Sequence, residues 1–280
     1  RGEPVCQERG EEEGQEAIVV RLDVGGNFRS LSFGDSAGTE TAVRCRGPTP
    51  EGCQAAQSQG VGLPDCASLG SCACDLQGQD LPFPGMQAMA ERVVLMCSAA
   101  AEPIRVLLVG LGGGAISSYL MDRCPPGRLS LENVEKDGRV ARLASQFFGF
   151  QPGPQNSVEV SDGLAATASR PAGAYDAVLV DCFASADRVP EGCRSNSFLA
   201  ATRALLRPQG LLLQNVWGRS SAGGAAVEGD FNATVEAYAD VFGRPPAREI
   251  VFDAPASLEY VLFGLQGQRW ASLLPQADGE

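Results

Sequence analysis

The sequence predicts an α/β fold in which a small antiparallel β region precedes a doubly wound parallel sheet. First, strand-like and helix-like segments alternate from residue 104 onward, as they do in βαβ units. Second, an apolar run at 106–109 ends in a turn dense in glycine, at 110–114. Third, the preceding strands are short and lie among residues rich in Gly, Pro and Cys. Together these patterns predict two structurally different parts in one chain.

Composition divides the chain into three regions. Residues 1–16 are acidic and rich in glycine, which predicts a flexible arm. Residues 17–80 predict a small β region with a cysteine-rich insertion, and residues 81–280 predict the α/β domain. The insertion, which we call the cysteine-rich segment, covers residues 46–80 and shows little hydrophobic periodicity. The strands expected in the β region are 18–22, 28–33 and 41–45.

The α/β domain is predicted to begin with a helix at 84–96, where methionines recur at helical spacing. The strands that follow are predicted at 104–110, 129–134, 157–160, 176–181 and 210–216. The helices between them are predicted at 115–122, 137–147, 162–168 and 197–206. A helix at 229–242 and two strands, at 249–252 and 260–265, close the domain. A closing hairpin after a doubly wound sheet is typical of the Rossmann-like, seven-stranded fold of class I methyltransferases, not of dinucleotide dehydrogenases.

Charge and residue usage exclude several classes of function. The chain carries 34 acidic and 22 basic residues, and this net charge of −12 argues against a nucleic-acid partner. Histidine is absent, which excludes Ser-His-Asp catalysis, Cys-His catalysis and histidine metal sites, and we expect no metal centre. No apolar run approaches the ~20 residues that a membrane-spanning helix needs, so we expect no transmembrane segment.

Ten cysteines are many for a chain of 280 residues, and six of them precede residue 80. An even number in a Gly- and Pro-rich region predicts disulfide bonds in an oxidising compartment, a secretory or organellar lumen. Zinc ligation and free thiols are the alternatives, but only Cys72 and Cys74 are closely spaced and no Cys-x-x-Cys pair occurs. The chain starts at Arg1, which fits removal of a targeting peptide, and the cytoplasm is the alternative location.

The glycine turn predicts a nucleotide-like cofactor. A buried strand that feeds a tight turn and a helix N-terminus brings backbone N–H groups close to a ligand. Glycine is needed where a side chain would block that approach or where φ is positive. Because small residues also occur at such turns for packing alone, the prediction needs support from other residues.

Acidic residues at the ends of the next three strands give that support. Glu135, about 20 residues past the glycines, can accept hydrogen bonds from both hydroxyls of a ribose. Asp162 stands where an adenine amino group could be read, and Asp181 lies at the edge where open α/β sheets bind ligands. Helix capping is the alternative for Asp137 and Asp162. Buried strand-end carboxylates such as Glu135 and Asp181 are costly without a partner, which favours a function.

These motifs resemble those of the spermidine synthase superfamily, and most closely its class I methyltransferase-like members, over residues 106–266. The matching segments are Gly110-Leu111-Gly112-Gly113-Gly114, Val134-Glu135, Gln146-Phe147-Phe148-Gly149-Phe150, Asp162-Gly163, Leu179-Val180-Asp181 and 204–213. Residues 17–45 resemble the short N-terminal β region of the same superfamily. The acidic arm and the cysteine-rich segment lie outside the resemblance.

The resemblance implies S-adenosylmethionine, or its decarboxylated form, as the cofactor. The residues that it implies as cofactor-binding are Gly110, Gly112, Gly114, Glu135 at the ribose, and Asp162 with Gly163 at the adenine. In aminopropyltransferases the carboxylate at the Asp181 position helps to deprotonate the attacking amine, so Asp181 is the expected catalytic residue. Transfer from a sulfonium needs a neutral, aligned amine, so one carboxylate suffices and histidine is not required.

The segment after Asp181 departs from the polyamine synthases. Those enzymes usually continue with an Asp-Ser-Ser-Asp-Pro-like sequence, whereas the next acid here is Asp187 and the proline is missing. The tyrosine and glutamine that clasp a polyamine also lack a clear match. The same loop holds Cys182 and Cys193, which either form a disulfide or stay free.

Three functions therefore stay open. The first is a methyltransferase whose acceptor is an amine or another group, in a small molecule or a protein. The second is an aminopropyltransferase, which the Asp181 match favours and the altered loop opposes. The third is a non-catalytic structural subunit of a larger assembly, contacted through the cysteine-rich N-terminal region.

Overall fold

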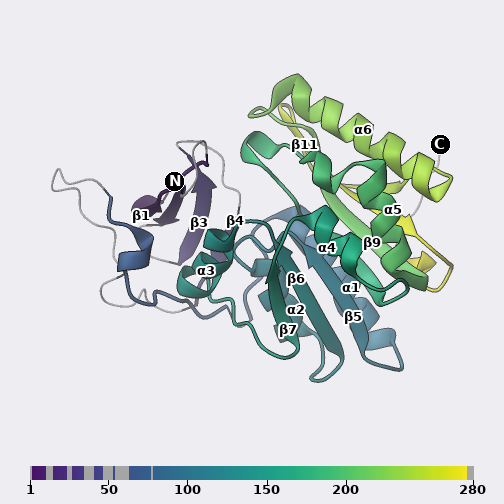
Figure 1. Cartoon of the computed structure of the whole chain (residues 1–280), viewed down its shortest axis with the longest axis horizontal. Coiled ribbons are helices and arrows are strands. Elements are labelled where there is room, and N and C mark those ends of the chain that lie inside the picture. The colour runs from purple at the N-terminus through teal and green to yellow at the C-terminus, as the bar shows by residue number, and fades with distance from the viewer. Residues whose placement is uncertain are drawn as a thin grey trace.

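The computed structural model describes residues 2–10, 15–23, 27–34, 41–46, 53, 63–76 and 78–275. These residues form a four-stranded sheet near the N-terminus and a seven-stranded sheet in the rest of the chain. Figure 1 shows the small sheet beside the large one, with helix α3 (Gly138–Phe147) next to the small sheet. The predicted α/β fold, a Rossmann-like seven-stranded sheet with a small N-terminal antiparallel β region, is confirmed.

The seven-stranded sheet has the order β10-β11-β9-β8-β5-β6-β7. Its strands are β5 (Ile104–Val109), β6 (Leu129–Glu135), β7 (Asn156–Val160), β8 (Tyr175–Val180), β9 (Leu206–Arg219), β10 (Ala247–Ala254) and β11 (Ser257–Leu265). Strands β5 to β9 pair in parallel, and the closing pair β10 and β11 is antiparallel. The strand order reverses between β5 and β8, and in open α/β sheets such a reversal marks the ligand-binding edge.

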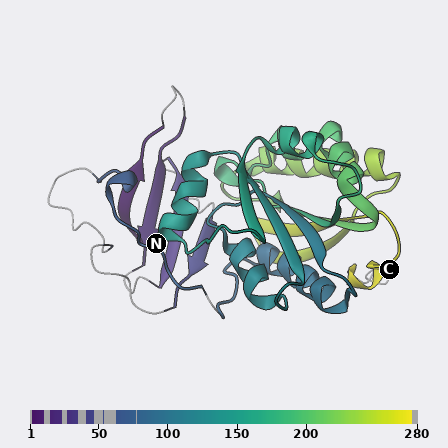
Figure 2. The same ribbon diagram turned by 60° about the horizontal axis from the view of Figure 1, so that its bottom comes forward.

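Helices cover both faces of this sheet. Besides α3 they are α1 (Pro84–Ala99), α2 (Ala115–Arg123), α4 (Gly163–Ser169), α5 (Asn196–Leu205) and α6 (Gly224–Phe242). Figure 2 shows α5 and α6, in green, on one side of the sheet and α1 and α2, in blue to teal, on the other. Within the described residues, no helix combines the length and the apolar character that a bilayer-spanning segment requires.

The alternation of side chains along the central strands divides the core between these two layers. Leu211 and Leu213 of β9 join the cluster that contains α1, whereas Leu212 and Val216 join the cluster that contains α5 and α6. Burying a leucine of this kind stabilises the fold by about 2 kcal/mol. Because both faces of the strand are covered, its apolar run is nearly continuous.

Two predicted boundaries differ from the structure by several residues. The last parallel strand was expected at 210–216, but β9 is longer because Leu206 pairs with Tyr175 of β8. The last helix was expected at 229–242, but it begins at Gly224, and Val227 in its first turn is buried.

The small sheet has the order β1-β2-β3-β4 and is antiparallel throughout. Its strands are β1 (Glu3–Glu8), β2 (Ile18–Leu22), β3 (Phe28–Phe33) and β4 (Thr41–Arg44). The flexible arm predicted for residues 1–16 is wrong at 3–8, because β1 pairs with β2 and buries Val5 and Cys6. The acidic run at 11–13 lies outside the described residues.

All ten cysteines form disulfide bonds, which confirms that prediction and sets aside zinc ligation. The pairs are Cys6–Cys66, Cys45–Cys74, Cys53–Cys72, Cys97–Cys124 and Cys182–Cys193. Cys6–Cys66 and Cys45–Cys74 connect the small sheet, or the residue that follows it, to the cysteine-rich segment, and Cys53–Cys72 closes a loop within that segment. Disulfide bonds therefore fix the conformation of this segment, although its sequence lacks hydrophobic periodicity.

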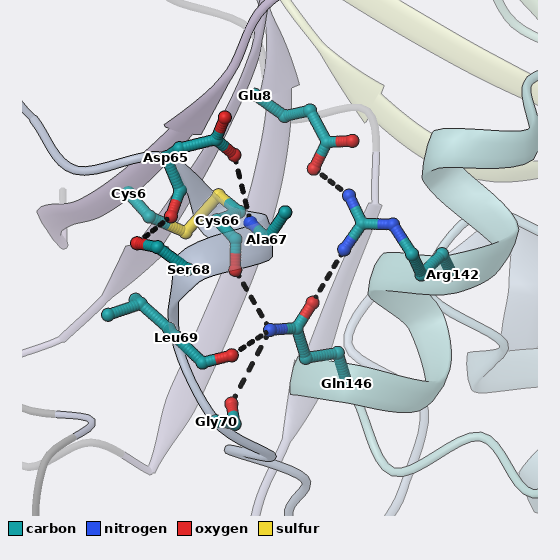
Figure 3. The surroundings of a disulfide bond; sticks show 10 residues. All are labelled: Cys6, Glu8, Asp65, Cys66, Ala67, Ser68, Leu69, Gly70, Arg142 and Gln146. Carbon is teal, nitrogen blue, oxygen red and sulfur yellow. Dashed lines mark hydrogen bonds and ion pairs between the residues drawn. A yellow bond between two sulfur atoms is a disulfide. The ribbon is translucent and has the colours of Figure 1, made fainter.

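Helix α3 connects the small sheet and the cysteine-rich segment to the large sheet. Figure 3 shows the amide of Gln146 pointing at three backbone carbonyls beyond the Cys6–Cys66 disulfide. Gln146 Nε2 donates to the carbonyls of Cys66 (2.9 Å), Leu69 (2.7 Å) and Gly70 (3.4 Å). One turn earlier, Arg142 forms an ion pair with Glu8 of β1. The helix after β6 therefore fixes the small sheet against the ligand-binding edge.

Candidate active site

The glycine turn joins β5 to α2 with three glycines in the left-handed region. Gly110, Gly112 and Gly114 have φ values of +94°, +54° and +74°. A Cβ on Gly110 would lie 2.2 Å from the carbonyl oxygen of Asp181, so the turn and the end of β8 approach too closely for any side chain. A Cβ on Gly114 would lie 2.7 Å from Phe150, so this glycine is needed for packing.

A cavity of about 170 Å³ lies at the carboxyl edge of the parallel strands. Five of the six expected cofactor-binding residues line it, together with the expected catalytic residue: Gly110, Gly112, Glu135, Asp162, Gly163 and Asp181. Gly114 is not among the lining residues, and its expected role in cofactor binding stays a prediction. Residues more than 70 positions apart in the sequence thus meet around one cavity, as expected from strand ends at one sheet edge.

Glu135 at the end of β6 holds the glycine turn in place. Its Oε2 accepts from the backbone N–H groups of Leu111 (3.2 Å) and Gly112 (3.1 Å), and its Oε1 accepts from Asp137 (3.0 Å). Burial raises the pKa of the Glu135 carboxyl above its usual range, and the three backbone donors oppose this shift. The carboxyl therefore has a structural role that the sequence did not reveal, besides facing the cavity.

Asp162 serves as a helix cap, which was the alternative weighed for it. Its Oδ1 accepts from the backbone N–H groups of Leu164 (3.0 Å) and Ala165 (3.4 Å) at the start of α4. Its other oxygen lies 3.5 Å from Nζ of Lys136. Asp137 likewise caps α3 by accepting from Arg139 N (2.9 Å). Asp162 nevertheless lines the cavity, so capping and ligand contact are compatible at this position.

Asp181 follows β8 and lines the same cavity as Glu135. Its backbone N–H donates to the carbonyl of Val109 (2.8 Å), which extends the pairing of β8 with β5. Its Oδ1 accepts from Nδ2 of Asn215 at 3.1 Å. Burial raises the pKa of the Asp181 carboxyl from 3.8 to about 6, and the Asn215 hydrogen bond offsets part of that rise. Such a carboxyl is ionised at neutral pH and still basic enough to accept a proton.

The loop over residues 182–195 closes one side of the cavity. The Cys182–Cys193 disulfide spans it, and both cysteines line the cavity. Ala186 and Asp187 have φ values of +62° and +60°, which are rare for residues with a side chain. The hydroxyl of Ser220 donates to Asp187. The loop whose sequence departs from the polyamine synthases therefore combines a strained backbone with a disulfide bond.

Several cavity residues were missed by sequence reasoning. Leu31, Phe33 and Thr41 of the small sheet form one wall, and Thr41 Oγ1 accepts from the backbone N–H of Gly113 (3.0 Å). No local pattern marks these residues, because they reach the cavity only through the packing of the small sheet. Asn215 does not line the cavity but hydrogen-bonds to Asp181, and it had a signal, since the polar pair Gln214-Asn215 follows the apolar run at 211–213.

The described residues offer no group of three or more His, Cys, Asp and Glu side chains that could hold a metal ion. The lining of the cavity offers the carboxyl groups of Glu135, Asp162 and Asp181 and the ammonium group of Lys136. Its acidic lining produces a negative potential, which favours ligands that carry positive charge.

Comparison with known proteins agrees with the resemblance drawn from the motifs. The chain is 32% identical over 121 residues to the polyamine aminopropyltransferase of Vibrio vulnificus, which covers 42% of this chain and 40% of that protein. It is 29% identical over 124 residues to the human eEF1A lysine and N-terminal methyltransferase, which covers 41% of this chain and 18% of that protein. The matched segment is thus less than half the length of each relative. No protein-family model matches the chain.

Among solved structures, a probable spermidine synthase from Corynebacterium glutamicum superposes with a TM-score of 0.66 at 17% identity. The superposition covers 94% of this chain and 80% of that structure, so it includes the small N-terminal sheet. The resemblance to the spermidine synthase superfamily and to class I methyltransferases is thereby confirmed for the fold and for the central segment.

Proposed function

We propose that this chain is an S-adenosylmethionine-dependent methyltransferase that acts on an amine, in a small molecule or a protein. The observation that carries the proposal is the convergence of the glycine turn with Glu135, Asp162 and Asp181 around one cavity. S-adenosylmethionine offers ribose hydroxyls, an adenine and a sulfonium cation, and the cavity offers a carboxylate within reach of each. The relatives support the same class of chemistry, since one is a methyltransferase and the other an aminopropyltransferase.

The residues present fit this cofactor. Gly110 and Gly112 line the cavity without side chains, and Glu135 is the acceptor for ribose hydroxyls. Asp162 and Gly163 provide the acceptor for an adenine amino group. Leu31 and Phe33 exclude water from the side that faces the small sheet. When bound, the cofactor supplies an electrophilic methyl group on a positively charged sulfur.

Asp181 is the residue that we assign to proton transfer. Methyl transfer would form a nitrogen–carbon bond as the carbon–sulfur bond breaks, and it requires an acceptor amine that has first lost its proton. The Asp181 carboxylate would accept that proton and pass it to solvent, which would leave the amine nitrogen neutral and able to take the methyl group. Because its pKa is raised to about 6, the carboxylate is a stronger base than an exposed aspartate, while it remains ionised at neutral pH.

Aminopropyl transfer is the second candidate, because the small sheet is shared with the spermidine synthase structure. The same cavity would then take decarboxylated S-adenosylmethionine. The two cofactors differ in one group, because S-adenosylmethionine carries a carboxylate and its decarboxylated form does not. The acidic lining of the cavity does not favour a carboxylate. The altered loop after Asp181 is the feature that ranks methyl transfer first.

Isothermal titration calorimetry with both cofactor forms tests the proposal. Binding of S-adenosylmethionine in preference to the decarboxylated form is expected, and Glu135→Ala is expected to weaken it at least tenfold. Glu159→Ala is the matched control, because this exposed glutamate on the neighbouring strand β7 does not line the cavity. Preference for the decarboxylated form would support aminopropyl transfer. If neither form binds at millimolar concentration, both transferase functions are contradicted, and the non-catalytic subunit is the hypothesis that remains.

The cellular location and the assembly remain proposals as well. The five disulfides support an oxidising compartment, because such bonds are rare where thiols are kept reduced. Mass spectrometry after alkylation without reductant counts the free thiols in protein purified from its native source. Zero labelled cysteines are expected, and ten would contradict the location.

A further inference from the structure

Three neighbouring strands present a polar residue on the same face of the large sheet at its carboxyl edge. On β8, β9 and β11 the residues that face α1 are apolar through most of their length, and they join one core cluster. Continuing the same alternation brings Asp181, Asn215 and Glu259 onto this face. Asn215 pairs with Val261, so Glu259 lies two residues along the partner strand. Asn215 and Glu259 lie against the first turn of α1, and Asp181 lies beside Asn215.

Glu259 and Asn215 are almost completely buried, at 3% and 4% exposure. Gly85 in the first turn of α1 closes over both of them. A Cβ on Gly85 would lie 2.3 Å from Oε1 of Glu259 and 2.5 Å from Oδ1 of Asn215. The backbone N–H of Gly85 is a hydrogen-bond donor to the Glu259 carboxyl. Glycine is therefore required at position 85, because any side chain there would keep the first turn of α1 away from the Glu259 carboxyl.

The Asn215 amide has one satisfied end and one unsatisfied end. Its Nδ2 donates to Asp181, whereas its Oδ1 is buried and has no hydrogen-bond partner among the described residues. A buried amide oxygen without a donor costs free energy, so a donor is expected beside it. The neighbouring group is the Glu259 carboxyl, which lies within hydrogen-bond reach of the same amide.

We propose that Glu259 is a positioning residue for Asp181 and acts through Asn215. The neutral Glu259 carboxyl donates to the free Oδ1 of Asn215, and this bond leaves Nδ2 directed at Asp181. An ionised Glu259 would instead compete with Asp181 for the Nδ2 donor. Glu259 does not line the cavity. Its protonation state nevertheless controls how firmly the Asp181 carboxylate, which does line the cavity, is held in place.

The surrounding charges favour the neutral form of Glu259. Burial raises its pKa from 4.5 to about 7, and the negative charges of Asp181 and Asp187 contribute to that rise. Hydrogen bonds that Asn215 Nδ2 and the Gly85 N–H can donate to the ionised carboxylate oppose the rise. Asp181 receives the hydrogen bond from Asn215 Nδ2, which favours its charged form, so we expect it to ionise first while Glu259 still carries its proton. This role in amine deprotonation rests on the proposed methyltransferase function. In that enzyme the ionised Asp181 would act as the base while the neutral Glu259 still holds Asn215 in position.

Carbon-13 NMR of the side-chain carboxyls, in protein labelled at Asp and Glu, measures these two protonation steps directly. The Asp181 signal is assigned by its absence in Asp181→Asn. In the wild-type protein, the Asp181 signal is expected to show its own titration and a second, smaller step as Glu259 ionises. Glu259→Gln keeps a neutral donor of similar shape, so the second step should vanish and the Asp181 pKa should stay near its wild-type value.

Glu259→Ala removes the donor and releases Asn215. Asp181 should then become about a tenfold weaker acid, because the charged form loses part of its hydrogen bonding. Equal Asp181 pKa values in the Gln and Ala variants would overturn the proposal, as would a wild-type signal without a second step. If Glu259→Ala does not fold, the comparison of Glu259→Gln with the wild type decides by itself. No cofactor is present in this titration, so its result is independent of the calorimetry that tests the methyltransferase.

Discussion

Replacing Asp181 by asparagine should stabilise the folded protein at neutral pH while abolishing proton transfer. The pKa of the carboxyl rises from 3.8 in an unfolded chain to about 6 in the fold, chiefly because of burial. The fold therefore favours the neutral form, and its contribution to stability is complete only below about pH 3.8. As the pH rises through 6, the carboxyl ionises within the fold and that contribution is lost.

The magnitude follows from the size of this change. Each pKa unit corresponds to about 1.4 kcal/mol, so a rise of about two units amounts to roughly 3 kcal/mol. Asparagine has the same shape, keeps an acceptor for Asn215 Nδ2 and cannot ionise. Because part of this free energy is already lost at pH 4, the difference in unfolding free energy between the variant and the wild type should grow by about 2.5 kcal/mol from pH 4 to pH 8.

Urea unfolding at several pH values, without reductant so that the disulfides persist, measures this difference. Tryptophan fluorescence and circular dichroism should give coincident transitions with equal slopes. Asp253→Asn is the control, because it makes the same substitution at a side chain that is 66% exposed. A stability difference for Asp181→Asn that stays constant from pH 4 to pH 8 would refute the reasoning.

Three further substitutions test separate parts of the site. Gly110→Ala should lower cofactor affinity at least tenfold in calorimetry and cost stability, because its Cβ would collide with the backbone of Asp181; unchanged affinity would contradict the close approach. Thr41→Val keeps the shape but removes the acceptor for Gly113 N–H, so we expect a loss of about 1–2 kcal/mol in urea unfolding and weaker cofactor binding; an unaltered free energy of unfolding would contradict this contact. Gln146→Leu should expose the cysteine-rich segment to limited proteolysis, because three carbonyls lose their shared donor; proteolysis at the wild-type rate would show that the disulfides alone hold the segment.

Much of the fold and part of the site could be predicted because the relevant signals are local. Each strand–turn–helix unit of the large sheet carries its own apolar run and punctuation, so the elements were predicted to within a few residues except at β9 and α6. Glu135, Asp162 and Asp181 were found because the carboxyl ends of parallel strands meet at one edge whatever the details of packing. For the same reason the glycine turn indicated a cofactor before any contact was known.

The remaining features depend on contacts that no local pattern specifies. The acid-rich β1 is a strand only because β2 pairs with it and Cys6 reaches Cys66. Disulfide pairing depends on which Cα atoms the fold brings within 4.9–6.3 Å of one another. The position of Glu259 beside Asn215 required the chain to return through α6 and β10 before pairing as β11 with β9. The sequence by itself thus determined the parallel sheet and the carboxylates that lie at the ends of its strands. Only the tertiary structure decided which side chains cover those carboxylates and hold them in place, because antiparallel pairing and disulfide bonds join residues that are distant along the chain.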